Sequence, residues 1–131
     1  MENHFDKLLN SLEELKQEIK KTTGINRAGV QQAMRLVADG KVSKPSSWNP
    51  PSAEQENVYI EKEGMEAYGN WHLGVDSNVD AKNKGHWTYV YTSDFKTVDR
   101  AALIAIRQRA GQQKETAIFE AAGKVLEKLD A

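Results

Sequence analysis

Most aromatic residues of this 131-residue chain lie in one central stretch. Seven of the ten fall between Tyr59 and Phe95, and a packed aromatic side chain buries roughly 150–250 Å². A chain of this length is expected to build one core. The central stretch must therefore supply the heavy part of that core, and the segments before and after it must cover it.

The clearest predicted strand lies inside this stretch. From His86 to Thr92, aromatic residues alternate with Thr and Val, and all of these residue types favour strands. Ser93-Asp94 is suited to a turn, after which Phe95 to Val98 predicts a second short strand. We therefore expect a small aromatic-rich β-hairpin.

Two consecutive helices are predicted after the hairpin. The first, Val98–Ala110, is apolar around most of its circumference, which is typical of a central helix, and Gly111 is expected to end it. The second continues to Leu129 and alternates an apolar side with a charged one, so it should bury one face. Its apolar side consists of Ile118, Phe119, Ala122, Val125, Leu126 and Leu129.

Helical and loop patterns also precede the aromatic stretch. Asn26 is suited to cap a helix over Arg27–Asp39 that ends at Gly40. Prolines forbid regular helix in Lys41–Pro51, and we expect Trp48 to anchor this loop against the core.

Two segments lie between this loop and the predicted strand. Ser52–Glu63 begins like a helix, but its Val58–Ile60 run suits a strand, so both alternatives stay open. Met65–Leu73 predicts a helix that ends at Gly74.

Five apolar residues near the N-terminus follow the a and d spacing of a heptad repeat. We call them the N-terminal seam: Phe5, Leu8, Leu12, Leu15 and Ile19. Thr22-Thr23-Gly24 ends this helix. The seam covers about two and a half heptads, fewer than the ~3–4 of an autonomous coiled coil. It either packs on its own domain or pairs with a partner helix or a second copy.

The composition excludes several classes of protein. The absence of cysteine excludes disulfides, thiolate metal sites and cysteine nucleophiles. No apolar run is long enough to cross a membrane, and the first residues do not resemble a signal peptide. We therefore expect a cytoplasmic protein with no membrane partner.

These patterns together predict a mostly helical α+β fold. About five helices should surround the small aromatic-rich β-hairpin. We expect one globular domain over residues 25–131, preceded by an amphipathic helix over residues 1–24.

The net charge of −1 conceals two stretches of opposite sign. Residues 45–81 contain seven acids and one base, whereas residues 82–114 contain seven bases and two acids. Either the protein has one acidic and one basic surface, or the two stretches face each other in the fold.

The basic stretch indicates an alternative function in binding nucleic acid, by phosphate contacts and base stacking. The candidate residues are Lys82, Lys84, Lys96, Arg100 and Arg107. Two observations weigh against it. The pI near 6.3 is low for such a protein, and the arginines of the Val98–Ala110 helix do not share one face.

Two motifs suggest metal binding or catalysis only weakly. Asp76, Asn78 and Asp80 match the first ligands of a calcium loop, but Ala81 and Trp87 stand where that loop needs Gly and Glu. We therefore interpret the motif as a turn whose side chains bond their own backbone.

His72 with Asp76 four residues later is a minimal general-base pair. Histidines among aromatic residues are usually structural, however, and the chain has no phosphate-binding loop, HExxH motif or nucleophile elbow. We therefore expect neither enzymatic activity, nor a cofactor, nor a metal.

Several segments resemble a small family of uncharacterised domains from tailed-bacteriophage and prophage proteins. They are Asp39–Val42, Trp48, Trp71–Asp76, Lys84–Tyr89, Arg100–Gln113, Ala121-Ala122 and Leu129-Asp130. The similarity runs from about Asn26 to Asp130, and Tyr91–Asp94 departs from the Pro/Gly-containing turn of such domains. Some of these domains occur near or joined to head-morphogenesis polypeptides. The resemblance implies a mobile-element origin and carries over no functional residue.

The sequence thus favours a non-enzymatic interaction or assembly module of phage or prophage type. It would bind a protein partner or a second copy of itself through the N-terminal seam. Nucleic-acid binding is the alternative.

Overall fold

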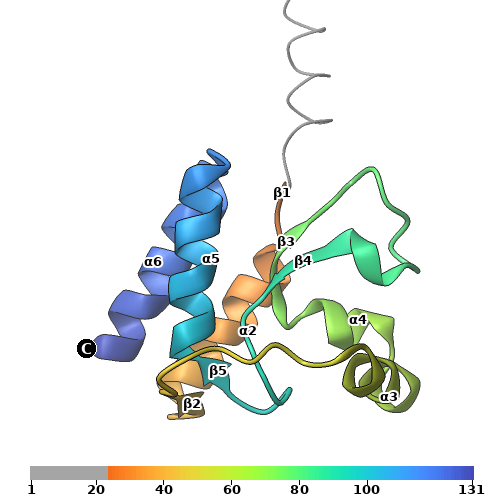
Figure 1. Cartoon of the computed structure of the whole chain (residues 1–131), viewed down its shortest axis with the longest axis horizontal. Coiled ribbons are helices and arrows are strands. Elements are labelled where there is room, and N and C mark those ends of the chain that lie inside the picture. Colours follow the sequence, from red (N-terminus) through yellow and green to blue (C-terminus); the bar gives the residue numbers. More distant parts are fainter. Residues whose placement is uncertain (1–23) are drawn as a thin grey trace, which may run out of the picture.

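The computed structural model describes residues 24–131, and this part of the chain is mostly helical with two small sheets (Figure 1). The helices are α2 (Arg27–Ala38), α3 (Ala53–Glu63), α4 (Met65–Gly69), α5 (Arg100–Gln112) and α6 (Thr116–Asp130), with a 3-10 turn, η1 (Lys84–His86). The strands are β1 (Gly24–Ile25), β2 (Val42–Ser43), β3 (His72–Val75), β4 (Trp87–Val90) and β5 (Val98–Asp99). The predicted mostly helical α+β class is confirmed.

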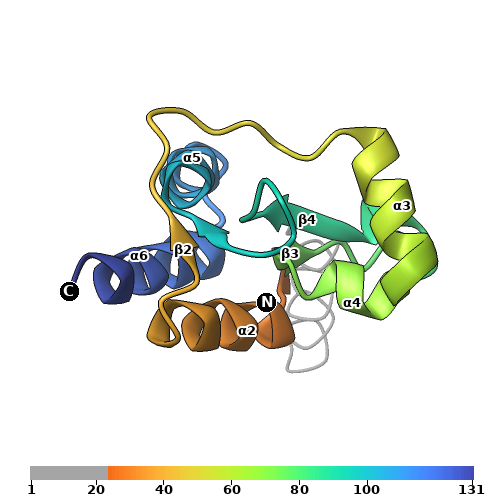
Figure 2. The same ribbon diagram turned by 90° about the horizontal axis from the view of Figure 1, so that it is seen from below.

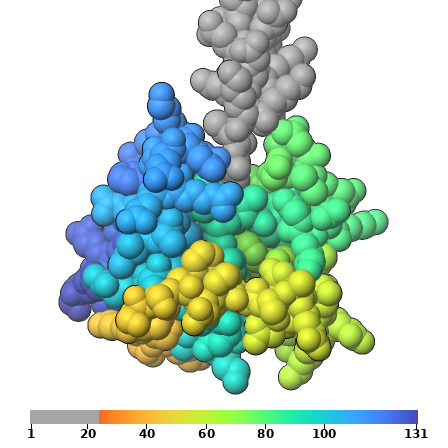
Figure 3. All heavy atoms as spheres, in the orientation of Figure 1, coloured from red at the N-terminus to blue at the C-terminus, as the bar shows by residue number. Residues whose placement is uncertain are grey.

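The elements form two groups around the larger sheet. α2, α5 and α6 pack together on one side of the molecule, and α3 and α4 lie on the other (Figures 1 and 2). The larger sheet has the order β1-β3-β4 with both pairs antiparallel, and β2 pairs with β5 in parallel. The loop 44–52 crosses one face of the molecule from β2 to α3 (Figure 3).

The core lies where the two groups meet, and the aromatic stretch supplies its heavy part, as predicted. The Trp71 and Tyr91 rings lie 5.6 Å apart, and Phe95 stacks on Tyr59 at 4.4 Å. Trp48 anchors the 44–52 loop through its indole N–H, which donates to the Thr92 carbonyl at 3.4 Å. Aliphatic residues from β3, β5, α5 and α6 complete the core: Leu73, Val98, Leu103, Ile118 and Val125.

Helix α2 begins where predicted, but the cap is different. Asn26 occupies the N-cap position, yet its side chain makes no cap hydrogen bond. Instead its amide donates to the carbonyls of Gly69 (2.9 Å) and His72 (3.0 Å). Asn26 is buried, so these long-range bonds satisfy a side chain that has left solvent. It therefore joins α2 to the α4–β3 connection.

The predicted Met65–Leu73 helix is wrong in its second half. α4 ends at Gly69, and His72–Val75 forms the central strand β3. The backbone of β3 pairs with β1 on one side and with β4 on the other. These ladder hydrogen bonds outweigh a weak helical preference. The ambiguous Ser52–Glu63 segment is helical, because Ser52 and Gln55 form a complete capping box.

The predicted return strand over Phe95–Val98 is also wrong. β4 pairs with β3, whereas β5 pairs with β2. The chain turns because the Asp94 carboxylate accepts from the backbone N–H groups of Lys96 and Thr97, both at 2.9 Å. Phe95 adopts a left-handed φ of 55°, which places its ring on Tyr59 instead of in a strand.

Helix α5 differs from the predicted central helix. It starts at Arg100, because Val98 and Asp99 form β5 and the Asp99 carboxylate caps the helix through the Ala102 N–H at 3.0 Å. It buries only one side, and Ile104 is 36% exposed. Gly111 lies inside the helix, and the left-handed residue beyond its end is Lys114, with a φ of 58°. Helix α6 buries one face, as predicted.

Candidate functional site

Helices α5 and α6 lie side by side, and hydrogen bonds connect them at both ends. At one end Glu115 N–H donates to the Ala110 carbonyl at 2.8 Å, closing the short turn between the helices. At the other end the Arg100 guanidinium binds the Asp130 carboxylate with two hydrogen bonds, of 2.9 and 3.1 Å. These bonds lower the pKa of Asp130 below its ordinary value. The two helices therefore form a fixed pair.

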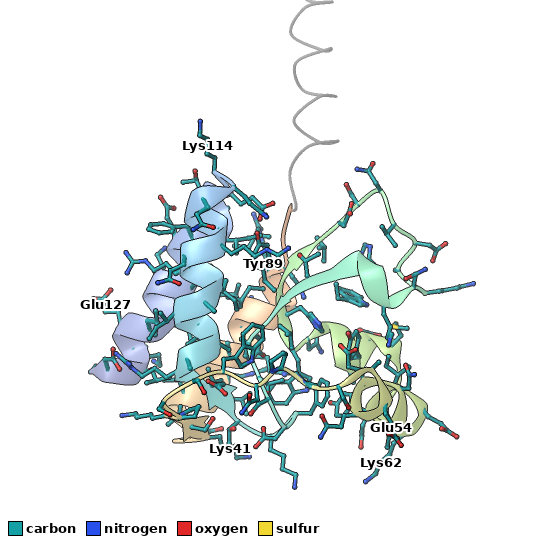
Figure 4. The ribbon with its side chains drawn as sticks, viewed as in Figure 1. Lys41, Glu54, Lys62, Tyr89, Lys114 and Glu127 are labelled. Atoms are coloured by element: carbon teal, nitrogen blue, oxygen red, sulfur yellow. The ribbon has the colours of Figure 1, made fainter. Side chains whose placement is uncertain are left out.

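The outer side of this pair is hollowed along its length. The largest hollow, of about 640 Å³, is lined by residues that we call the α5–α6 groove: Arg100, Ile104, Arg107, Phe119, Glu120, Gly123, Lys124, Leu126, Glu127 and Asp130. A second hollow of about 300 Å³ shares Ile104, Phe119 and Leu126, and a third of about 490 Å³ continues past Phe119 to Lys114. In Figure 4, Glu127 and Lys114 mark the two ends of this outer side.

The groove is apolar along its floor and charged along its rims. Ile104, Phe119 and Leu126 form the apolar floor. The Arg107 guanidinium lies 4.6 Å from the centre of the Phe119 ring, a cation–π contact. The α5 rim is basic, whereas the α6 rim carries acids: Glu120, Glu127 and Asp130. Lys124 is the basic residue on the α6 side.

The lining residues follow one spacing on both helices. On α5 they are spaced four, three and four apart: Arg100, Ile104, Arg107 and Gly111. On α6 the same spacing recurs: Phe119, Gly123, Leu126 and Asp130. This is the a/d spacing of helices that pack along a common seam. Three of these eight positions carry large apolar side chains, Ile104, Phe119 and Leu126, and the last two also pack against the core.

The N-terminal seam (Phe5, Leu8, Leu12, Leu15 and Ile19) lies outside the described residues. Its prediction as an interaction surface therefore stays a prediction.

The basic residues suggested for nucleic acid lie in different places. Arg100 and Arg107 line the α5–α6 groove together. Lys84, in η1, forms an ion pair with Glu56 of α3 at 3.5 Å. Lys96 lies beside α3, in the turn before β5, and the remaining candidate, Lys82, lies in the loop between β3 and η1. The structure therefore brings together two of the five candidates.

The two stretches of opposite charge meet at one described ion pair. Lys84 belongs to the basic stretch and Glu56 to the acidic stretch. The other described ion pair, Arg100–Asp130, joins the basic stretch to the last helix.

The suggested His72–Asp76 pair does not form. His72 is 2% exposed, and its Nδ1 donates to the Tyr68 carbonyl at 2.9 Å. Burial lowers the pKa of His72 to about 4, so the ring is neutral near pH 7. Asp76 follows β3, and residues four apart along a strand are separated by roughly 13 Å. This histidine therefore has a structural role, joining β3 to α4.

The calcium-like motif is a pair of turns, as interpreted from the sequence. The Asp76 carboxylate accepts from the Asn78 N–H at 2.9 Å, and Asp80 accepts from the Lys82 N–H at 2.8 Å. No group of three or more His, Cys, Asp or Glu side chains in residues 24–131 is arranged to hold a metal ion. Within the same residues, none of the helices combines the length and apolarity needed to span a membrane.

Tyr89 connects the sheet to the α5–α6 turn. Its backbone adopts a left-handed φ of 62°, and its hydroxyl donates to the Glu115 carboxylate. The Arg109 guanidinium lies 5.8 Å from the ring centre. Burial raises the pKa of the Tyr89 hydroxyl above its ordinary value, so the hydroxyl stays protonated. A small polar hollow of about 210 Å³ lies beside it.

A separate hollow of about 480 Å³ lies between α3 and the turn before β5. Val58 is 59% exposed at its edge, and Tyr59 with Phe95 forms its stacked aromatic wall. Its charged lining residues are three acids and two bases, and both α3 and the turn contribute both signs, so they do not form two separate rims: Glu54, Lys62, Glu63, Asp94 and Lys96.

Comparisons of the chain with protein-family models, with curated proteins and with solved structures give no match. The candidate site therefore depends on geometry alone.

The sequence interpretation missed the apolar floor of the α5–α6 groove. Ile104 is predicted to lie in a central helix; Phe119 and Leu126 are predicted on the apolar side of the last helix, and they do pack against the core while their remaining surface lines the groove. The signal that marks the groove is the repeated four-three-four spacing on both helices. It was hidden on α5 because Ala101, Ala102 and Ala105 make several faces look equally apolar.

Proposed function

We propose that the protein is a non-enzymatic protein-interaction or assembly module, of the phage or prophage type that the sequence resemblance implies. It works through amphipathic helices, and the N-terminal seam makes it oligomerise. The observation that carries the proposal is the α5–α6 groove, with an apolar floor and charged rims on an otherwise rigid helix pair.

The shape and lining of the groove favour a helix as the bound group. An amphipathic helix binds by laying its apolar stripe along a groove while its flanks meet the charged rims. The hollows run along the helix pair without forming one enclosed cavity, which suits a long ligand. Phosphate backbones are disfavoured here, because Glu120, Glu127 and Asp130 line the same groove as the two arginines.

Two further observations support a role without catalysis. His72, the histidine of the suggested general-base pair, is buried and held by the Tyr68 carbonyl. Asp76 and Asp80 bond their own turns.

Light scattering after gel filtration of the full chain tests the proposal. We expect the wild-type chain to oligomerise and the Leu12→Glu variant to be a monomer, because a charge in the seam opposes burial. Gln17→Glu is the matched control, since it adds the same charge at a predicted position opposite the seam. A wild-type chain that is strictly monomeric, with a Leu12→Glu variant that folds and behaves identically, would contradict the proposal.

A further inference from the structure

We propose that the α5–α6 groove is the receptor for the N-terminal seam of a second copy of this chain. This inference depends on the proposed function and specifies its contact: residues 5–19 of one chain lie along α5 and α6 of another.

The spacing of the two surfaces matches. The N-terminal seam advances by three and four residues from Phe5 to Ile19. The groove presents four-three-four stripes on α5 and on α6, with Ile104, Phe119 and Leu126 at its apolar floor. Helices with this periodicity pack along one line, each inserting its apolar residues between those of its neighbours. A third helix would therefore complete a three-helix seam on the open side of the pair.

The lengths also match. The helix predicted for residues 5–19 would be about 22 Å long at 1.5 Å per residue. Helix α5 has 13 residues and α6 has 15, which corresponds to about 20 and 22 Å. The seam is therefore long enough to cover the hollowed side of the pair without extending far beyond it.

The charges beside the N-terminal seam complement those on the rims of the groove in one of the two possible orientations of the bound helix. On a helical wheel one side of the seam carries Lys16, Lys20 and Glu13, and the other carries Glu14, Glu18 and Lys7, so the two sides have net charges of +1 and −1. The groove has Arg100 and Arg107 on the α5 rim, whereas the α6 rim has three acids and Lys124. In one orientation the net negative side of the seam, with Glu18, faces the arginines, whereas the reverse orientation places sides of like net charge together.

The short link between the seam and β1 favours binding of a second copy's seam over binding of the chain's own seam. Only Lys20–Thr23 separate Ile19 from Gly24 of β1, and the five Cα–Cα steps between them span at most about 18 Å. β1 is bonded to β3 and contacts α6 inside the fold. Passing around a helix of 10–12 Å diameter to reach its outer side requires roughly 16–19 Å, so the chain's own seam reaches the groove only with this link stretched to its limit. The seam of another copy reaches the groove without this detour.

Complementation between two variants of the full chain tests the inference. Leu12→Glu places a charge in the seam and leaves the groove unchanged, whereas Ile104→Glu places a charge in the floor of the groove and leaves the seam unchanged. We expect each variant alone to be a monomer by light scattering. Mixed in equal amounts they should form a one-to-one complex, because the seam of one variant meets the groove of the other.

The controls distinguish loss of the seam-to-groove contact from loss of the folded structure. Ile104 is 36% exposed, so its replacement leaves the core in place. Val58→Glu is the matched control, because it places the same charge at an exposed apolar residue on α3, outside the groove. It should oligomerise like the wild type. Arg107→Glu provides a second groove variant, and its association should return when it is combined with Glu18→Arg in the same chain. Circular dichroism spectra must agree for all variants.

Three results would overturn the inference. If Leu12→Glu is monomeric while Ile104→Glu still oligomerises, the seams pair with each other, and the proposed function survives without this contact. If both variants are monomeric and their mixture stays monomeric, no seam-to-groove contact forms between chains. If the wild type is a strict monomer that the variants leave unchanged, the proposed function fails with it.

Discussion

Single side chains set how closely α2 approaches the central strand. Gly29 faces the backbone of β3, where an added Cβ atom would lie 1.8 Å from the His72 carbonyl oxygen. The Asn26 amide bonds that same carbonyl and the carbonyl of Gly69. The ring of His72 in turn bonds the carbonyl of Tyr68. Neighbouring polar groups around β3 are thus satisfied within the protein, and no space is left for an additional atom.

Replacing Gly29 with Ala should therefore destabilise the fold strongly. The new methyl group would clash with backbone atoms of β3, which cannot move aside as the end of a flexible side chain can. We therefore expect a loss of about 3 kcal/mol or more in the free energy of unfolding. Urea denaturation measures it. Gly24→Ala is the control, because its Cβ atom would lie 3.6 Å from the Val75 side chain, an ordinary contact. Equal stability of the two variants would show that α2 does not approach β3 this closely.

The burial of His72 predicts a pH dependence of stability. The pKa of His72 is about 4 in the folded protein, against an ordinary value of 6.5, because burial disfavours the charged ring. The unfolded chain therefore binds a proton between these values that the folded protein does not. The free energy of unfolding should fall as the pH falls from about 6.5 to 4, by on the order of 3 kcal/mol in total.

Denaturation at several pH values, compared with His72→Gln, isolates this contribution. Glutamine keeps a donor for the Tyr68 carbonyl and does not titrate, so its stability should fall less over that range. NMR should show that the His72 ring protons do not shift between pH 5 and 7. A normal titration of His72 in the folded protein would contradict the prediction.

At the scale of elements, the sequence predicts the helices and strands whose own residues show a periodic apolar pattern or a capping motif. Helices α2 and α6 and strand β4 follow from residue periodicity, and α3 follows once its capping box is recognised. The two-residue strands β1, β2 and β5 have no period to detect, because backbone partners far along the chain define them. β3 was mistaken for helix for the same reason.

The candidate site could be predicted only in part, for a related reason. Arg100 and Arg107 were singled out from the sequence, but as ligands for phosphate. Their place beside Ile104 and Phe119 depends on which side of α5 faces the core, and its alanines do not specify that side. The N-terminal seam stays a prediction, made because apolar residues spaced three and four apart among charged ones define one face of a predicted helix.

The turn between α5 and α6 predicts a stabilising substitution. Lys114 adopts a left-handed φ of 58°. This conformation is strained for any residue with a Cβ atom but not for glycine. Lys114→Gly should raise the free energy of unfolding by roughly 0.5–1 kcal/mol. Gln108→Gly, in the helical interior of α5, should instead lower it by about 1 kcal/mol. Thermal unfolding of both variants checks this contrast, and a lower melting temperature for Lys114→Gly would contradict the assigned turn.

At the scale of the whole molecule, rigid and open parts are separated. The sheet, α2 and the core-facing sides of α5 and α6 enclose the aromatic core, and the buried side chains of Asn26 and His72 bond within the protein. On the outer sides of α5 and α6, Phe119 and Leu126 are partly buried against that core, whereas Ile104 is 36% exposed. In the proposed association, a second copy would bury the apolar surface that these residues still expose.

If folding and association are linked through this surface, the stability of the full chain must depend on its concentration. Partner binding to the folded state adds RT ln(1 + [L]/Kd), so each tenfold increase above Kd adds about 1.4 kcal/mol and should raise the melting temperature by roughly 5 °C for a domain of this size. Leu12→Glu and Ile104→Glu should each lose this dependence, whereas Val58→Glu should keep it. Scanning calorimetry over a hundredfold range of concentration measures the effect. A melting temperature that stays constant for the wild type would mean that association contributes nothing to the folded state, and the outer side of α5 and α6 would then need a different partner.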